Sequence, residues 1–132
     1  MKNFVRWLAG GFIVGTAGFA VWGTSHAAVP GDANRGAKAY EAKCTGCHSL
    51  DANRIGPAHR GVYGRKAGSA PKFSYSPGLL KSRIIWTEPT LDKWLANPQA
   101  TIPGARMGFR LGDAAARADV IAFLKRESAK KK

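Results

Sequence analysis

Small and apolar side chains recur with helical spacing soon after residue 31. Gly36, Ala37, Tyr40 and Cys44 follow one another at intervals that place them on one stripe, and Asp32 before them is a favoured N-cap residue. A glycine inside a helix costs about 0.5–1 kcal/mol and is expected where another backbone must approach closely. The pattern therefore predicts a helix that begins after Asp32 and is crossed by a partner at Gly36.

A second amphipathic helix is predicted near the C-terminus. Asp113 suits its N-cap, the helix should run from residue 114 to about 127, and Val120, Phe123 and Leu124 form its apolar stripe. Two basic residues in its last turn complement the helix dipole. We expect this helix to cross the first one, and the three closing lysines to form a frayed, solvated tail.

The middle of the chain is rich in glycine and proline and shows no convincing strand alternation. Pro77 predicts the start of a short helix of about six residues. Thr87 predicts the start of a clearer helix, which carries Trp94 on its apolar face and is stopped at Pro98. The predicted class is therefore all-α with extensive loops, and such loops need something to wrap around.

Two thiols and an imidazole lie within five residues, Cys44 to His48, at the end of the first predicted helix. The order C-x-x-C-H is the signature of c-type haem attachment. Cys44 and Cys47 can each form a thioether with one of two vinyl groups on the same porphyrin edge, and His48 then lies under the iron as an axial ligand. We expect one covalent haem c, and the occupant of the second axial position decides between an electron carrier and an enzyme.

Other interpretations of this motif are weaker. A thioredoxin-like C-x-x-C requires a βαβ context, which this chain does not show. A zinc site needs four ligands, and Cys44, Cys47, His48 and the distant His59 would be a poor set. A disulfide between residues three apart would close too small a loop to stabilise the chain much.

The second axial ligand is expected to be Met107. It is the only methionine after residue 27 and follows a Pro-Gly pair that would stiffen and turn its loop. A lone methionine more often fills a gap in the core, but the haem motif and the loop setting favour ligation here. His59 is the competitor. It follows His48 closely in sequence, so we expect it on the side that His48 already occupies, as a packed or hydrogen-bonded histidine.

The first 27 residues have the pattern of an export signal. Lys2 and Arg6 form a basic start, and an uncharged stretch ends in small residues that suit cleavage before position 28. We therefore expect a signal peptide over 1–27, one domain over 28–132, and a periplasmic location. The alternative is an uncleaved anchor, because the uncharged stretch approaches the roughly 20 residues of a bilayer crossing. Anchoring requires that residues 1–27 be retained.

Basic residues outnumber acidic ones, 21 to 8, and the net charge of +13 becomes +11 without Lys2 and Arg6. Segments 52–87 and 93–112 contain bases and no acid. Such charge can serve solubility or attract nucleic acid, but an exported protein rarely meets nucleic acid. We expect instead a monomer that docks on acidic redox proteins, such as a membrane cytochrome complex, a terminal oxidase or a dehydrogenase.

Several motifs occur in a fixed order along residues 28–132. They are Gly31-Asp32, Cys44 to His48, Gly56-Pro57, Gly64-Arg65-Lys66, Phe73 to Ser76, Trp86, Asn97-Pro98, Ile102 to Met107 and the last helix. Together they resemble the class I c-type cytochromes, in particular soluble bacterial periplasmic carriers close to mitochondrial cytochrome c. The resemblance implies a cytochrome c fold of three to five helices, with crossing terminal helices, long loops around one covalent haem, and His48 and Met107 as axial ligands.

The resemblance also implies roles for residues around the haem. The carbonyl of Pro57 would accept a hydrogen bond from the His48 ring and fix its orientation. Three further positions match those that hold the buried haem propionates, and a buried carboxylate needs such partners. They are Arg65, Tyr75 and Trp86. Phe109 matches the aromatic residue beside the exposed haem edge, and Arg106 a basic position close to it.

The chain departs from the mitochondrial proteins at several positions. Its loop from His48 to Pro57 is shorter, which indicates the bacterial branch. Trp94, Leu79 and Ala105 replace three polar residues that organise a buried water beside the methionine, so we expect a drier methionine side with the Trp94 indole N–H as its only nearby donor. His59 replaces an apolar residue, for which the sequence gives no reason.

The function expected from these observations is one-electron transport between an acidic reductase and an acidic oxidase, without chemistry on a small-molecule substrate. A haem peroxidase would need an open iron site with acid–base groups, and the occupied second axial position and the lack of a spare distal histidine argue against it. A dedicated haem c subunit or acceptor of one dehydrogenase complex is the remaining alternative, and the sequence does not choose between it and a general shuttle.

Overall fold

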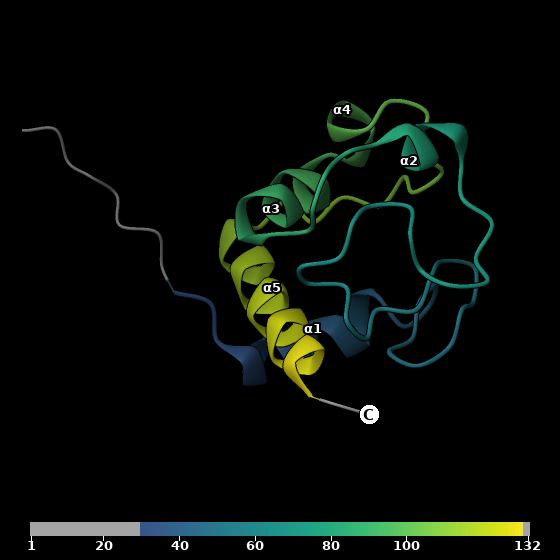
Figure 1. Ribbon diagram of the computed structural model, residues 1–132. Coiled ribbons are helices and arrows are strands. Elements are labelled where there is room, and N and C mark those ends of the chain that lie inside the picture. The colour runs from purple at the N-terminus through teal and green to yellow at the C-terminus, as the bar shows by residue number, and fades with distance from the viewer. Residues whose placement is uncertain (1–29, 131–132) are drawn as a thin grey trace, which may run out of the picture.

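The computed structural model describes residues 30–130, which form five helices and no strand. In chain order the helices are α1 (Ala33–Lys43), α2 (Pro77–Lys81), α3 (Glu88–Ala96), α4 (Pro98–Thr101) and α5 (Ala114–Ala129). A single antiparallel bridge joins Lys66 to Ile85 within the long loop region. The prediction of an all-α fold with long loops is therefore confirmed (Figure 1).

Helix α1 begins where the sequence predicts. The Asp32 carboxylate accepts hydrogen bonds from the backbone N–H groups of Asn34 and Arg35, at 2.9 and 2.7 Å, which satisfies two of the free donors at the helix N-terminus. At the other end Cys44 is the C-cap, and its N–H donates to the Tyr40 carbonyl. The C-x-x-C-H motif therefore starts at the point where the helix ends.

Helices α1 and α5 cross with Gly36 at the contact, as predicted (Figure 1). A Cβ atom on Gly36 would overlap the carbonyl oxygen of Asp119 in α5 and would lie 2.9 Å from the Cβ of Phe123. Beside this point the rings of Tyr40 and Phe123 lie 5.0 Å apart between centroids. The glycine therefore permits a backbone approach that no side chain would allow.

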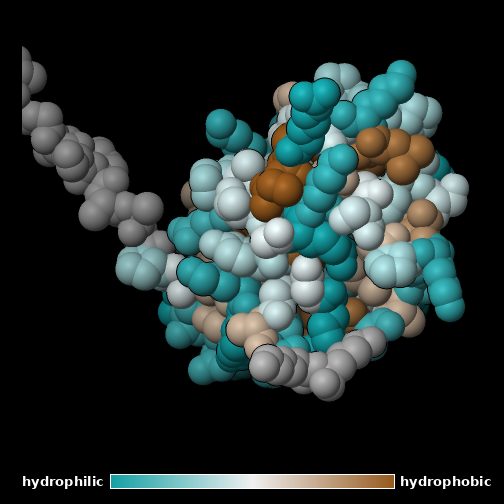
Figure 2. Space-filling model, viewed as in Figure 1, coloured by the Kyte–Doolittle hydropathy of each residue, from teal (hydrophilic) through white to brown (hydrophobic). Residues whose placement is uncertain are grey.

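The core lies between α5 and the helices that pack on it. Val120 and Leu124 in α5 are 1 % and 3 % exposed, and Leu91 and Leu95 in α3 are almost equally buried. Helix α3 contacts α5 near the N-terminal end of α5, where Arg117 pairs with Asp92 (Figure 1). The face drawn in Figure 2 is largely hydrophilic, with hydrophobic side chains in a few places. These contacts make α5 the support for both other long helices.

One expectation about element ends is confirmed with an addition, and two others need correction. Pro98 ends α3 but also begins α4, because the Asn97 side chain accepts from the Ala100 N–H and caps a new turn. Helix α5 runs two residues beyond the expected end. Lys130 does not belong to a frayed tail, since its Nζ lies 2.7 Å from the Glu127 carboxylate.

The predicted signal peptide, residues 1–27, lies outside the described residues, as do the last two lysines. Between residues 30 and 130, no helix has both the length and the apolar character needed to cross a membrane.

A buried carboxylate ties the start of α1 to α5. The Asp119 side chain is 10 % exposed and accepts hydrogen bonds from the Asp32 N–H at 2.6 Å and from Arg35 Nε and Nη2 at 2.8 Å each. Because these donors favour the charged form, with the Arg35 hydrogen bond as the main cause, the pKa of Asp119 lies below its usual value of 3.8. No role for Asp119 was expected from the sequence.

Replacement of Asp119 by asparagine is expected to lower the free energy of unfolding by about 2 kcal/mol at pH 7, since hydrogen bonds to a charged group are lost. A lowered folded-state pKa adds stability above the unfolded-state value of 3.8, and this contribution disappears as the pH falls through the folded-state pKa. The difference in the free energy of unfolding between the wild-type protein and the Asp119→Asn variant should therefore narrow below pH 3.8. Denaturant unfolding of the haem-loaded proteins measures it. The exposed Glu41→Gln serves as the control, and a gap independent of pH would contradict the assignment.

Candidate functional site

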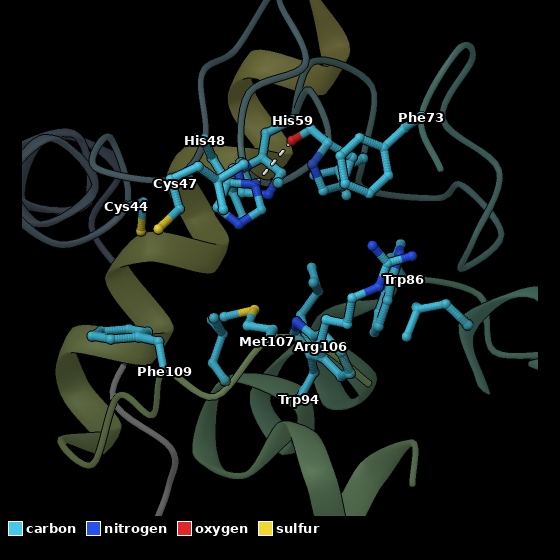
Figure 3. A pocket seen from close by; sticks show the side chains of 18 of the residues that line it. Cys44, Cys47, His48, His59, Phe73, Trp86, Trp94, Arg106, Met107 and Phe109 are labelled. Atoms are coloured by element: carbon cyan, nitrogen blue, oxygen red, sulfur yellow. Dashed lines mark hydrogen bonds between the residues drawn. The ribbon is translucent and has the colours of Figure 1, made fainter. Parts of the chain in front are cut away.

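A cavity of about 440 Å³ lies between the loops and the core, in the size range of small-molecule and cofactor sites. Its walls come from nearly every part of the described chain (Figure 3). All ten residues predicted from the sequence as cofactor-binding residues line this cavity. They are Cys44, Cys47, His48, Pro57, Arg65, Tyr75, Trp86, Trp94, Met107 and Phe109. The fold thus brings together residues up to 65 positions apart in the chain.

The two cysteines lie on a tight turn at the end of α1. The N–H groups of Cys47 and His48 both donate to the Cys44 carbonyl, at 3.1 and 2.9 Å. Both sulfur atoms lie at one end of the cavity, and no disulfide joins them (Figure 3). Burial raises the pKa of the Cys44 thiol to about 11. The turn therefore presents two sulfur atoms, three residues apart in the chain, to the same cavity.

The His48 ring is held by its neighbours on the loop. Its Nδ1 lies 2.9 Å from the Pro57 carbonyl oxygen, and because a carbonyl only accepts, Nδ1 carries the proton and Nε2 keeps its lone pair. Burial lowers the pKa of His48, which favours the neutral ring that a metal requires. A Cβ on Gly56 would overlap this ring. The side chain is thus prepared as a neutral ligand with a fixed tautomer.

His59 lies directly beside this ring. The two imidazoles are stacked with centroids 4.0 Å apart and planes inclined by 20° (Figure 3). The Tyr40 hydroxyl and His59 Nδ1 share a hydrogen bond of 3.1 Å. Burial lowers the pKa of His59 well below its usual value, and the ring is neutral. His59 is therefore on the His48 side and hydrogen-bonded, as expected from the sequence.

Met107 lies across the cavity from His48, on the loop between α4 and α5 (Figure 3). Gly104 turns this loop with φ of 79°. The Gln99 side chain then donates to the backbone carbonyls of Ala105 and Met107, the latter at 3.2 Å, and Arg106 Nη2 donates to the Ser74 carbonyl at 3.0 Å. Gln99 is a supporting residue that the sequence analysis missed, since nothing in its local pattern distinguishes it from a solvated glutamine.

One wall of the cavity has buried donors that lack partners among the described residues. Arg65 donates from Nη1 and Nη2 to backbone carbonyls at 3.2 and 3.0 Å, but its buried Nε has no partner among the described residues. The buried Ser76 hydroxyl also has none. The Tyr75 oxygen accepts from the Ala70 N–H at 3.1 Å, which leaves its hydroxyl proton free to donate. These groups fit the carboxylates of a haem, because such anions would satisfy them.

Ser76 is the second site residue that the sequence analysis missed. Its place before Pro77 marks it as the N-cap of α2, yet its side chain makes no capping hydrogen bond. The hydroxyl therefore stays available for the cavity. Leu79 and Trp94 line the same cavity, and Ala105 is buried nearby in the core, while the expected dry methionine side remains a prediction.

The mouth of the cavity combines apolar and basic side chains. Phe109 is 41 % exposed and Ile55, which the sequence analysis did not single out, is 79 % exposed. Lys43 and Arg106 line the cavity as well and are exposed to solvent. An apolar opening with positive charge around it is suited to contact with an acidic partner surface.

Crossed terminal helices, a C-x-x-C-H turn and a cavity with buried donors for carboxylates together define a small c-type haem protein. The comparisons with known proteins identify its family. The family model for cytochrome c matches residues 33–127, and the chain belongs to the cytochrome c family.

Relatives and a solved structure agree with this assignment. The chain is 48 % identical over 88 residues to cytochrome c2 iso-1 of Magnetospirillum molischianum, covering 63 % of this chain and 88 % of that protein. It is 43 % identical over 108 residues to cytochrome c2 of Rhodomicrobium vannielii, covering 79 % and 85 %. The structure of cytochrome cH from Methylobacterium extorquens superposes with a TM-score of 0.70 at 39 % identity, covering 73 % of this chain and 99 % of that one.

The family assignment settles the cofactor and the general activity. Cytochromes c carry a haem c bound covalently through a cysteine pair, which here is Cys44 and Cys47, and they are electron carriers rather than enzymes. When bound, the haem iron supplies a one-electron couple, and the protein contributes its ligands, its burial and its docking surface.

Proposed function

We propose that this protein is a periplasmic one-electron carrier whose iron site is closed by His48 and Met107. The observation that carries the proposal is the placement of these two side chains on opposite sides of one cavity (Figure 3). The His48 ring offers a neutral Nε2, and the Met107 loop is held by Gln99 and Gly104. A soft thioether favours the reduced state and raises the potential.

The remaining site residues receive roles that follow from their contacts. Arg65, Tyr75 and Ser76 would hold the haem carboxylates, because each has a donor free for that purpose. Trp86, which the resemblance places beside the haem carboxylates, and Trp94 have ring centroids 5.3 Å apart, and the two rings would also form the wall that excludes water from the haem face. Burial of the haem in this way limits solvent reorganisation when an electron arrives or leaves.

The partners that this surface favours are acidic redox proteins, such as a membrane cytochrome complex, a terminal oxidase or a dehydrogenase. Exposed bases at the cavity mouth, including Lys43 and Arg106, would steer them to the haem edge beside Phe109. Export of the protein through cleavage before Ala28 is part of the same proposal. The mass of the mature protein tests it, and retention of residues 1–27 would indicate an anchored form instead.

The proposed docking mode is tested by the rate of electron transfer to an acidic redox protein at increasing salt. Screening over about 8–10 Å at 0.1–0.15 M salt should slow the reaction progressively. Exchange of Arg106 for glutamine should weaken the salt dependence, whereas Lys130→Gln at the far end of α5, away from the cavity lining, should change it less. Stoichiometric co-purification with one dehydrogenase that survives high salt would favour a dedicated subunit.

A further inference from the structure

His59 and Tyr40 form a polar pair in a place where an apolar pair would pack without any loss of hydrogen bonds. The Tyr40 side chain is buried, with 4 % of the residue exposed, and its hydroxyl is 3.1 Å from His59 Nδ1. Each of these two atoms has the other as its one hydrogen-bond partner recorded among the described residues. Burial of two polar groups that satisfy only each other stabilises a protein little, so packing alone is a poor explanation for the pair.

The pair connects His48 to the crossing of helices α1 and α5. Tyr40 lies in α1 and packs against Phe123 of α5 at the helix crossing, with ring centroids 5.0 Å apart. The His59 backbone N–H donates to the carbonyl of Ser49 at 3.0 Å, and Ser49 is the residue that follows His48. His59 is thus anchored at its backbone by the loop and at its ring by α1.

The stack constrains a motion of His48 that the Pro57 hydrogen bond leaves open. A single hydrogen bond holds Nδ1 but tolerates a range of angles, because such bonds weaken steeply only below about 120°. A flat ring at 4.0 Å with only 20° between the planes opposes tilting of the His48 imidazole out of its present plane. An aliphatic side chain would fill the space without specifying the angle of the ring.

We propose that Tyr40 and His59 are a positioning pair that sets the ring plane of His48 relative to the haem. Tyr40 fixes the angle of His59 through the hydrogen bond, and His59 transmits that angle to His48 through the stack. The inference rests on the proposed role of His48 as an axial ligand. It requires no change in the charge of either ring.

The test uses proton NMR of the haem-loaded ferric protein. The order and spread of the four haem-methyl resonances report the orientation of the axial imidazole plane, because that plane directs the unpaired spin density over the porphyrin. His59→Leu is expected to change the order or spread of these shifts. Tyr40→Phe, which removes one oxygen atom and no packing, should shift them in the same direction by a smaller amount. His59→Phe, which retains a flat ring, should stay closer to the wild-type pattern than His59→Leu.

Two comparisons keep this test decisive. Ile121→Val, a buried change in α5 outside the cavity lining, should lower stability without moving the methyl shifts. The Tyr40→Phe/His59→Leu double variant should match His59→Leu alone, because Tyr40 acts only through His59. A wild-type shift pattern in His59→Leu would overturn the proposal and leave His59 as packing. Loss of the ferric thioether charge-transfer band in the wild-type protein would instead contradict Met107 ligation, so the two failures are distinguishable.

Discussion

Replacement of Gly36 by valine is expected to lower the free energy of unfolding by more than about 4 kcal/mol, a large part of the roughly 5–15 kcal/mol that stabilises a small domain. A Cβ at this position would overlap the Asp119 carbonyl oxygen and would lie 2.9 Å from the Phe123 Cβ. Both neighbours belong to α5, which also supports α3, so relief of the overlap must separate helices at the centre of the core. Denaturant unfolding of the haem-loaded protein measures the loss.

The control for this prediction is Gly112→Ala. A Cβ at Gly112 would have no atom within 4 Å, and the φ angle of this residue is not in the left-handed region, so its stability should change by less than about 0.5 kcal/mol. The loss of stability for Gly36→Ala should lie between those of Gly36→Val and Gly112→Ala, because one methyl group still meets the α5 backbone. Equal stability of the valine variant and the control would show that the helices do not depend on this close approach.

The crossing at Gly36 could be predicted from the sequence because its signals are local. A glycine on the apolar stripe of one helix and an apolar stripe in another are visible in the spacing of nearby residues. The same holds for the caps Asp32 and Asp113, whose carboxylates each accept from two N–H groups in the first turn. The C-x-x-C-H turn is also local, since its chemistry is contained in five residues.

Contacts between distant charged residues could not be predicted in this way. Asp119 bonds to Arg35 across 84 positions, and Glu127, 6 % exposed at its side chain, lies 3.4 Å from Arg60 across 67 positions. Arg60 also pairs with Asp51 at 2.5 Å, which links the His48 loop to the end of α5. Helical periodicity places a carboxylate on a face but does not identify its partner, and a charge on an apolar face gives no local sign of being satisfied.

In the candidate site too, some residues could be predicted from local sequence and others could not. Cys44 and His48 follow from a motif, whereas the supporting residues Ser76 and Gln99 became visible only through contacts in space. The sequence predicts Ser76 as a helix N-cap. Only its unpaired hydroxyl, buried at the cavity, indicates a second role as a donor to a haem carboxylate. Pro98 is a related case, because the same proline that stops α3 starts α4 once Asn97 caps the next turn.

Replacement of Met107 by alanine is expected to lower the midpoint potential by about 0.1–0.3 V, within the roughly 0.8 V over which axial ligands set haem potentials. In the proposed site the substitution removes the thioether that favours the reduced state, and water or another weak ligand would take its place. Stability should fall less than in the Gly36 variant, because Met107 lies at the cavity on a partly exposed loop. Potentiometric titration gives the potential, and the ferric thioether charge-transfer band should vanish.

The controls for this prediction separate ligation from loop packing. Ile102→Val trims a buried residue of the same loop, 5 % exposed, and should cost about 1 kcal/mol of stability without changing the potential. Gln99→Ala removes the amide that holds the Ala105 and Met107 carbonyls, so it should weaken the band while retaining most of the potential. Only the alanine variant at Met107 should bind added imidazole readily, because only there is the second axial position opened. An unchanged potential and band in that variant would assign Met107 to the core and leave the closed-site carrier without its second ligand.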